Sequence, residues 1–178
     1  MAGDLYHYFV EGECEKALIK AFMHVDKGSY CFKPGKVEKL NFVFEKLTPA
    51  KAMSIKKGTK VVIIFDTDVD QIDIFENNID ILIKHGDVDG RNIILVPSVI
   101  NFEEEIVYSC ESINNINDIF NTKGKEEFKN KFINHKDLVS KLYSVGFDIN
   151  KMWSRDPKRP FDRYKNHSLL FKEKTSKE

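Results

Sequence analysis

The chain has 178 residues, of which 42% are hydrophobic and 12% aromatic, which suits one folded domain with a buried core. Its 28 basic and 28 acidic residues balance to a formal net charge of zero, which conceals a segregation of charge along the chain. No run approaches the roughly 20 apolar residues of a membrane span, and the first ten residues lack the basic start and apolar core of a signal peptide. We therefore expect no membrane association and a cytoplasmic location.

The first predicted element is a strand over residues 5–10, because these residues are mostly aromatic or β-branched. Glu11 and Gly12 end this strand. From Glu13 onward, apolar residues recur at three- and four-residue spacing, which predicts a helix with Glu15 in its first turn.

The later elements continue an alternation of strands and helices. The predicted elements are a weak strand over residues 30–33 ended by Pro34-Gly35, a helix over 43–53 that Pro49 breaks or offsets, a strand over 61–66, a helix over 73–84, a strand over 91–96, and short helices between 114 and 145. Such alternation is typical of an α/β fold with a mainly parallel sheet.

The central strand ends in three acids. An unbroken apolar run from Val61 to Phe65 leads to Asp66, Asp68 and Asp70, which is typical of a parallel strand covered on both faces. Because alternate side chains of an extended chain point the same way, we expect the three carboxylates to emerge on one side. Their repulsion calls for a cation, and oxygen ligands favour Mg²⁺ or Mn²⁺. The alternative is that Asp70 begins or caps the next helix.

Glu11 and Asp66 close two different predicted strands. Open α/β sheets carry their chemistry at the carboxyl ends of the strands. We therefore expect these two acids to meet at one edge of the sheet.

Charge is segregated along the chain. Residues 66–118 hold thirteen acids against two bases, whereas residues 151–178 hold nine bases against four acids. An acidic centre with a basic end suits a metal site served by phosphate-binding arms. The alternative is that both regions are ordinary solvated surface.

The basic residues near the proposed edge and in the C-terminal segment are expected to contact a nucleic-acid backbone. The predicted nucleic-acid-binding residues are Lys16, Lys60, Arg155, Lys158, Arg159 and Arg163. Trp153, Phe161 and Tyr164 either stack on bases or cover the core, and the sequence leaves both interpretations open.

The cysteines and histidines predict structural roles. Cys14, Cys31 and Cys110 are widely spaced without a Cys-x-x-Cys pair, which predicts buried, reduced thiols and no zinc site. No two histidines have metal-ligand spacing.

Two motifs resemble those of the Toprim domain, the metal-binding α/β module of topoisomerases, bacterial primases and several nucleases. They are Phe9-Val10-Glu11-Gly12, followed by Glu15 and a helix, and Ile63-Ile64-Phe65-Asp66-Thr67-Asp68-Val69-Asp70. The resemblance covers roughly residues 4–112 and implies a Rossmann-like, mainly parallel sheet of about four strands flanked by helices. We expect a helical and basic C-terminal extension over residues 113–170 and a disordered tail over 171–178.

The resemblance also implies the site residues. In that family the glutamate after the first strand takes part in acid–base chemistry or metal binding, and the Asp-x-Asp pair coordinates magnesium. Glu11, Asp66 and Asp68 are therefore the expected catalytic residues. The expected ligands of Mg²⁺ or Mn²⁺ are Glu11, Glu15, Asp66, Asp68, Asp70 and Glu103. Phe102-Glu103-Glu104 resembles a later acidic position of the nuclease branch, although Glu104 or Glu105 also fits that position.

The nuclease branch includes overcoming-lysogenization-defect nucleases and small stand-alone Toprim proteins of phage-defence loci. The sequence shows no tyrosine-bearing strand-passage domain, zinc-binding module or ATPase domain. The resemblance thus implies a magnesium-dependent nuclease of DNA or RNA, acting in anti-phage defence with an ATPase or another defence protein as partner. The alternatives are a non-catalytic Toprim module that binds nucleic acid or a protein, and a haloacid dehalogenase-like phosphatase, whose strand also ends in Asp-x-Asp.

Overall fold

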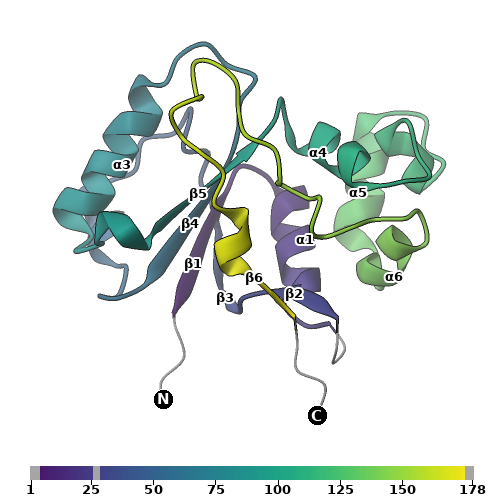
Figure 1. Cartoon of the computed structure of the whole chain (residues 1–178), viewed down its shortest axis with the longest axis horizontal. Coiled ribbons are helices and arrows are strands. Elements are labelled where there is room, and N and C mark those ends of the chain that lie inside the picture. The colour runs from purple at the N-terminus through teal and green to yellow at the C-terminus, as the bar shows by residue number, and fades with distance from the viewer. Residues whose placement is uncertain (1–4, 26–28, 175–178) are drawn as a thin grey trace.

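The computed structural model describes residues 5–25 and 29–174 as an α/β fold (Figure 1). Four parallel strands form the main sheet in the order β3-β1-β4-β5, and helices flank it, as the sequence predicts for a Rossmann-like architecture. In the part of the chain that is described, no helix combines the length and apolar character needed to cross a bilayer.

The main sheet consists of β1 (Tyr6–Val10), β3 (Gly35–Lys39), β4 (Lys60–Asp66) and β5 (Ile93–Ser98). The helices are α1 (Glu13–Phe22), α2 (Pro49–Met53), α3 (Asp73–His85), α4 (Phe102–Ser109), α5 (Lys125–Asn134) and α6 (Leu138–Tyr143). Two short strands, β2 (Tyr30–Phe32) and β6 (Lys172–Lys174), pair antiparallel beside it. Single 3-10 turns lie at η1 (Gly90–Asn92), η2 (Ile116–Ile119) and η3 (Ser168–Phe171).

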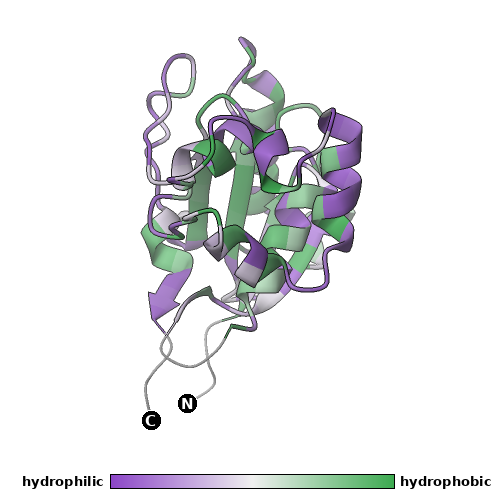
Figure 2. Cartoon of the chain, turned by 90° about the vertical axis from the view of Figure 1, so that its right-hand side faces the viewer, coloured by the Kyte–Doolittle hydropathy of each residue, from purple (hydrophilic) through white to green (hydrophobic). Residues whose placement is uncertain are grey.

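Each face of the sheet has its own hydrophobic core. Alternate residues of β1 and β4 belong to different cores: Tyr8 and Val62 pack toward α1, α4, α5 and α6, whereas Phe9 and Ile63 pack toward α2 and α3. The two helical layers lie on opposite sides of the strands (Figure 1), and the helices turn polar residues outward (Figure 2). The unbroken apolar run of β4 is explained by this double coverage.

The sheet grows in two directions from β1. β3 pairs with one edge of β1 and β4 with the other, so the connections that follow β1 and β4 leave the sheet on different sides. In open α/β sheets, ligands bind in the crevice that such a reversal creates at the carboxyl ends of the strands. Glu11 and Asp66 stand at this point.

Two elements differ from the sequence-based expectation. The weak strand predicted over residues 30–33 is confirmed as β2, which ends before Pro34-Gly35, but the strand that starts at Gly35, β3, was not predicted. A Cβ on Gly35 would lie 2.5 Å from the Tyr6 carbonyl oxygen, so glycine permits this close pairing. The helix predicted over residues 43–53 covers only Pro49–Met53, because Pro49 starts a helix readily and Thr48 caps it.

The C-terminal segment completes both cores. Trp153, Phe161 and Phe171 are 0% exposed, and they pack on Phe32 and Phe65 at ring distances of 5.3 to 5.8 Å. Base stacking by Trp153 and Phe161 is therefore wrong, and their alternative role as core residues is confirmed.

The tail predicted to be disordered is partly ordered. Phe171 is buried and β6 pairs with β2, so disorder is wrong for residues 171–174, while 175–178 lie outside the described residues. Within the predicted extension over 113–170, α5 and α6 are helical, and residues 144–167 are mostly turns and irregular chain.

Candidate functional site

Glu11 and Asp66 meet at the carboxyl edge of the sheet, as expected. β1 and β4 lie side by side, with Phe9 opposite Ile63. The Asp66 backbone N–H donates to Glu11 Oε1 at 3.1 Å, and Asn41 Nδ2 donates to Glu11 Oε2 at 3.0 Å. These two hydrogen bonds hold the carboxylate of Glu11 against the end of β4.

Glu15 joins them from the first turn of α1. Its side chain is almost wholly buried, with 6% of the residue exposed. A Cβ at position 12 would lie 2.8 Å from Glu15 Oε2, so Gly12 leaves the space that the carboxylate occupies. Gly12 therefore has two roles: it forms the turn after β1, and it leaves room for the carboxylate of Glu15.

These acids line a cavity of about 470 Å³, which we call the acid–lysine pocket. Its walls include carboxylates from α1, β4, α4, α5 and the turn after β1, and amines from β3 and α5. The charged and amide residues that line it are Glu11, Glu13, Glu15, Lys39, Asn41, Asp66, Glu103, Lys125, Glu126, Lys129 and Asn130.

The carboxylates of the pocket are held in an environment that disfavours their charge. Burial raises the pKa of Asp66 strongly, and Glu11, Glu15 and Asp68 raise it further. Burial also raises the pKa of Glu11, to which Glu15 and Asp68 add. Burial and the nearby Glu103 raise the pKa of Glu15 to about 7. Crowded, desolvated carboxylates of this kind are typical of functional sites.

One atom of the group lacks a partner. Asp66 Oδ1 is buried and makes no hydrogen bond to the described residues. A buried acceptor without a donor carries the cost of its lost hydration. The oxygen is thus free to accept a ligand.

The donor chemistry of the pocket fits a hard divalent cation, because carboxylate oxygens are the ligands that Mg²⁺ and Mn²⁺ prefer. The side chains do not converge on one point, however. Within residues 5–25 and 29–174, no three His, Cys, Asp or Glu side chains are arranged to hold a metal ion. Binding therefore requires rotation of these side chains toward a shared centre.

The expectation that Asp66, Asp68 and Asp70 share one side is wrong. β4 ends at Asp66, so the alternation of an extended chain stops there. Asp66 lines the acid–lysine pocket, whereas Asp68 and Asp70 are exposed and line a different hollow. Asp70 does not cap the next helix either, since Ile72 occupies the N-cap of α3.

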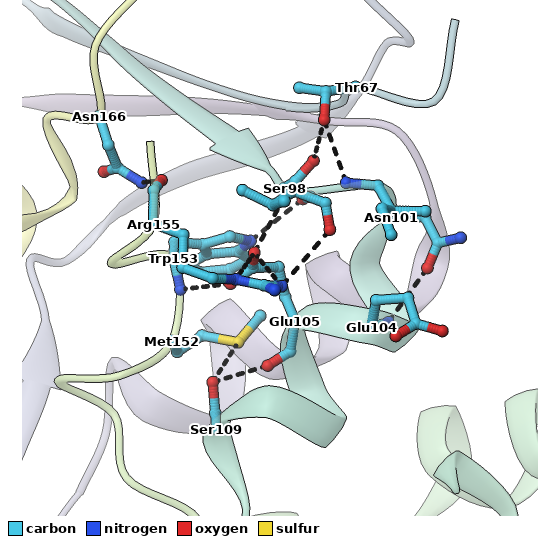
Figure 3. Close-up of polar contacts among 12 residues, drawn as sticks. Thr67, Ser98, Asn101, Glu104, Glu105, Ser109, Met152, Trp153, Arg155 and Asn166 are labelled. Atoms are coloured by element: carbon cyan, nitrogen blue, oxygen red, sulfur yellow. Dashed lines mark hydrogen bonds and ion pairs between the residues drawn. The ribbon is translucent and has the colours of Figure 1, made fainter. Parts of the chain in front are cut away.

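The three glutamates of α4 have different surroundings, and Figure 3 shows those of Glu104 and Glu105. Glu103 lines the acid–lysine pocket and pairs with Lys125 at 2.9 Å, which resolves the choice among the three. Glu104 is exposed, and its backbone N–H donates to Asn101 Oδ1. Glu105 points the other way and is buried.

Glu105 anchors the C-terminal segment instead of serving the site (Figure 3). Its carboxylate accepts hydrogen bonds from the backbone N–H groups of Val99 at 2.9 Å and Trp153 at 3.0 Å. Arg155 donates to the same carboxylate at 2.7 and 3.1 Å and stacks on Tyr108.

Several residues predicted to bind nucleic acid have other contacts. Lys60 begins β4, at the opposite end from Asp66, so its predicted place near the active edge is wrong. Arg155 is committed to Glu105, and Lys16 pairs with Glu13 at 3.1 Å.

The remaining cations of that set lie on the loop between Trp153 and Ser168. Arg163 forms an ion pair with Glu76, while Lys158 and Arg159 are exposed. The linings of the acid–lysine pocket include none of these three residues.

The cations that do line the pocket are Lys39, Lys125 and Lys129. Sequence reasoning missed them, together with Asn41. Lys125 and Lys129 are four residues apart, so they share one face of α5, and that spacing was the available signal. Lys39 closes β3, a strand that the sequence did not reveal.

The other predicted structural residues behave as expected. Cys14, Cys31 and Cys110 are free and buried. His7 bonds to Glu38 at 3.1 Å and stacks on Phe9, which is a structural role.

The chain matches no protein family, no curated protein and no solved structure.

Proposed function

We propose that the protein is a metal-dependent nuclease that hydrolyses phosphodiester bonds of DNA or RNA at the acid–lysine pocket, with Mg²⁺ or Mn²⁺. The observation that carries this proposal is the crowding of Glu11, Glu15 and Asp66 at the reversal point of the sheet. Their charge is disfavoured there, and a divalent cation would relieve it. Lysines line the same pocket, where they could form ion pairs with a phosphate group.

Each residue has a defined part in this proposal. Glu11, Glu15 and Asp66 hold the ion, and Asp68 and Glu103 complete its surroundings. A divalent ion held by these residues would supply water activation and offset the charge that develops on the phosphate. Asn41 keeps Glu11 in place through its hydrogen bond.

The lysines bind the substrate in this scheme. Lys125 pairs with Glu103, and Lys39 and Lys129 stand on the same walls. A phosphate entering the pocket would exchange the Glu103 partner of Lys125 for its own oxygens.

The arrangement agrees with the Toprim resemblance in its central feature, since the glutamate after the first strand lies beside the aspartate that ends the central strand. We therefore extend the proposal to that family's nuclease branch, to a cytoplasmic role in anti-phage defence and to an ATPase or another defence protein as partner. Asp70 is left out of the metal set because it lines another hollow and, unlike Asp68, is not among the charges that raise the pKa values of Glu11 and Asp66.

A second candidate function is a Toprim-type module that binds nucleic acid or a protein without cutting. It is favoured by the finding that the described acids do not converge on one point and that Glu103 already pairs with Lys125. A phosphatase with Asp66 as nucleophile is less supported, because the Asp-x-Asp strand of the haloacid dehalogenase pattern normally lies near the start of the chain, whereas β4 here follows the β1–α1 unit that carries Glu11 and Glu15.

Two substitutions test the nuclease proposal. Glu11→Gln and Asp66→Asn keep the side-chain volume but remove a charged ligand. We expect each to lower Mg²⁺-dependent cleavage of single-stranded and duplex RNA and DNA by about 100-fold or more, because ligands of a catalytic metal act together.

The matched control is Glu104→Gln, an exposed acid on the same helix as Glu103. It should cut as wild type does. A wild-type protein that binds but never cuts would replace the nuclease by the binding module.

A further inference from the structure

A second hollow of about 340 Å³ lies beside the acid–lysine pocket, and we call it the Phe44 hollow. It is lined by Val43, Phe44, Asp68, Val69, Asp70, Gln71 and Ile74. The segment that follows β4 joins the two cavities, with Asp66 in the first and Asp68 in the second. Asp68 also raises the pKa values of Glu11 and Asp66, so its charge acts on the acid–lysine pocket as well as on the Phe44 hollow.

Phe44 is an exposed aromatic residue that lines this hollow. Its residue surface is 64% exposed, and single exposed apolar residues need no explanation by themselves. Phe44, however, lines the same hollow as Asp68, two residues beyond Asp66 of the acid–lysine pocket. An aromatic ring beside a phosphate-binding pocket can stack on a nucleobase.

Asn41 fixes Phe44 and Glu11 with one side chain. Its Nδ2 donates to Glu11 Oε2, while its Oδ1 accepts from the backbone N–H groups of Val43 at 3.0 Å and Phe44 at 3.1 Å. Glu45 Oε1 closes the same turn by accepting from the Asn41 N–H at 3.2 Å. The turn that presents the ring is thus tied to the acid that the proposed reaction uses.

We propose that Phe44 is a stacking platform for a nucleobase of a single-stranded nucleic acid whose phosphate enters the acid–lysine pocket. The inference rests on the proposed function, because it names the substrate class of that same site. The chemistry required is a flat apolar ring close to a phosphate, which a nucleotide strand supplies. Bases in a duplex are already stacked on each other, so only an unpaired strand can lay a base on Phe44.

The test measures binding of fluorescent 12-residue oligo(dT) and oligo(U) by anisotropy, with Ca²⁺ in place of Mg²⁺ and with a duplex of the same length for comparison. We expect Phe44→Ala to bind the single strands about tenfold more weakly than wild type, since one stacked base contributes about that much. Phe44→Trp should bind within twofold of wild type, because it keeps an aromatic face.

The matched control is Met53→Ala, on α2, which removes a side chain that is 68% exposed and lines neither cavity. It should bind as wild type does, and circular dichroism checks that all variants fold. The inference is overturned if Phe44→Ala binds both single strands as wild type does, if Phe44→Trp binds as weakly as Phe44→Ala, or if the duplex binds as tightly as the single strands.

Failure of this inference differs from failure of the proposed function. Cleavage that needs Glu11 and Asp66 but is unchanged in Phe44→Ala refutes the stacking platform and leaves the nuclease. Binding that depends on Phe44 in a protein that never cuts supports the platform and refutes the nuclease.

Discussion

At the scale of single residues, the acids of the pocket lower the stability of the folded protein. Asp66 is half-buried beside Glu11 and Glu15, and its buried Oδ1 has no hydrogen-bond partner among the described residues. Groups held in this way weaken the fold unless a ligand compensates them.

Removing the charge of Asp66 should therefore stabilise the protein in the absence of divalent ions. We expect Asp66→Asn in EDTA at pH 8 to raise the free energy of unfolding by about 1 kcal/mol or more, measured by urea denaturation. Millimolar Mg²⁺ should stabilise wild type but not the variant, because only wild type keeps the full ligand set. A variant less stable than wild type in EDTA would contradict this account.

The sequence was most informative where a strand ended in an acid. Glu11 and Asp66 could be paired in advance, because parallel strands bring their carboxyl ends to one edge. Asp70 was misplaced because strand alternation stops at Asp66, and no local pattern marks that last residue. Lys39 and Asn41 were missed since their roles depend on tertiary contacts with β1 and Glu11.

At the scale of elements, α4 presents its glutamates to two different parts of the molecule. Glu103 in its first turn faces the pocket, while Glu105 faces the C-terminal segment and holds Trp153 and Arg155 (Figure 3). Runs of consecutive acids on a helix point in different directions, so the sequence alone could not assign them.

Glu105→Ala should destabilise the protein by about 3 kcal/mol, because it leaves Arg155 and two backbone N–H groups without their buried partner. Urea denaturation measures the change. Glu104→Ala, on the same helix but exposed, should stay within about 0.5 kcal/mol of wild type. Equal effects of the two substitutions would show that the anchor is unimportant.

At the scale of the whole molecule, the fold class followed from the alternation of strands and helices, but the extent of the folding unit did not. The resemblance ended at about residue 112, whereas Phe161 completes one core and Trp153 and Phe171 complete the other. Aromatic residues among prolines and basic residues give no periodicity, so the sequence could offer burial of Trp153 and Phe161 only as one of two interpretations.

A chain cut after residue 112 should therefore fail to fold cooperatively. We expect it to lack a sharp thermal transition by circular dichroism and to be digested rapidly by trypsin, because both cores are left open. The full chain provides the comparison under the same conditions. A truncated protein with a cooperative transition would show that residues 5–112 are self-sufficient.

The pairing of β2 with β6 has a consequence for how the protein is made. β6 holds nearly the last described residues, and its partner lies within the first quarter of the chain. During translation, β2 therefore stays without its partner strand until the residues of β6 have emerged from the ribosome. The two cores also stay incomplete until Trp153, Phe161 and Phe171 have been added, so we expect nascent chains that stop before β6 to be cut readily by proteases.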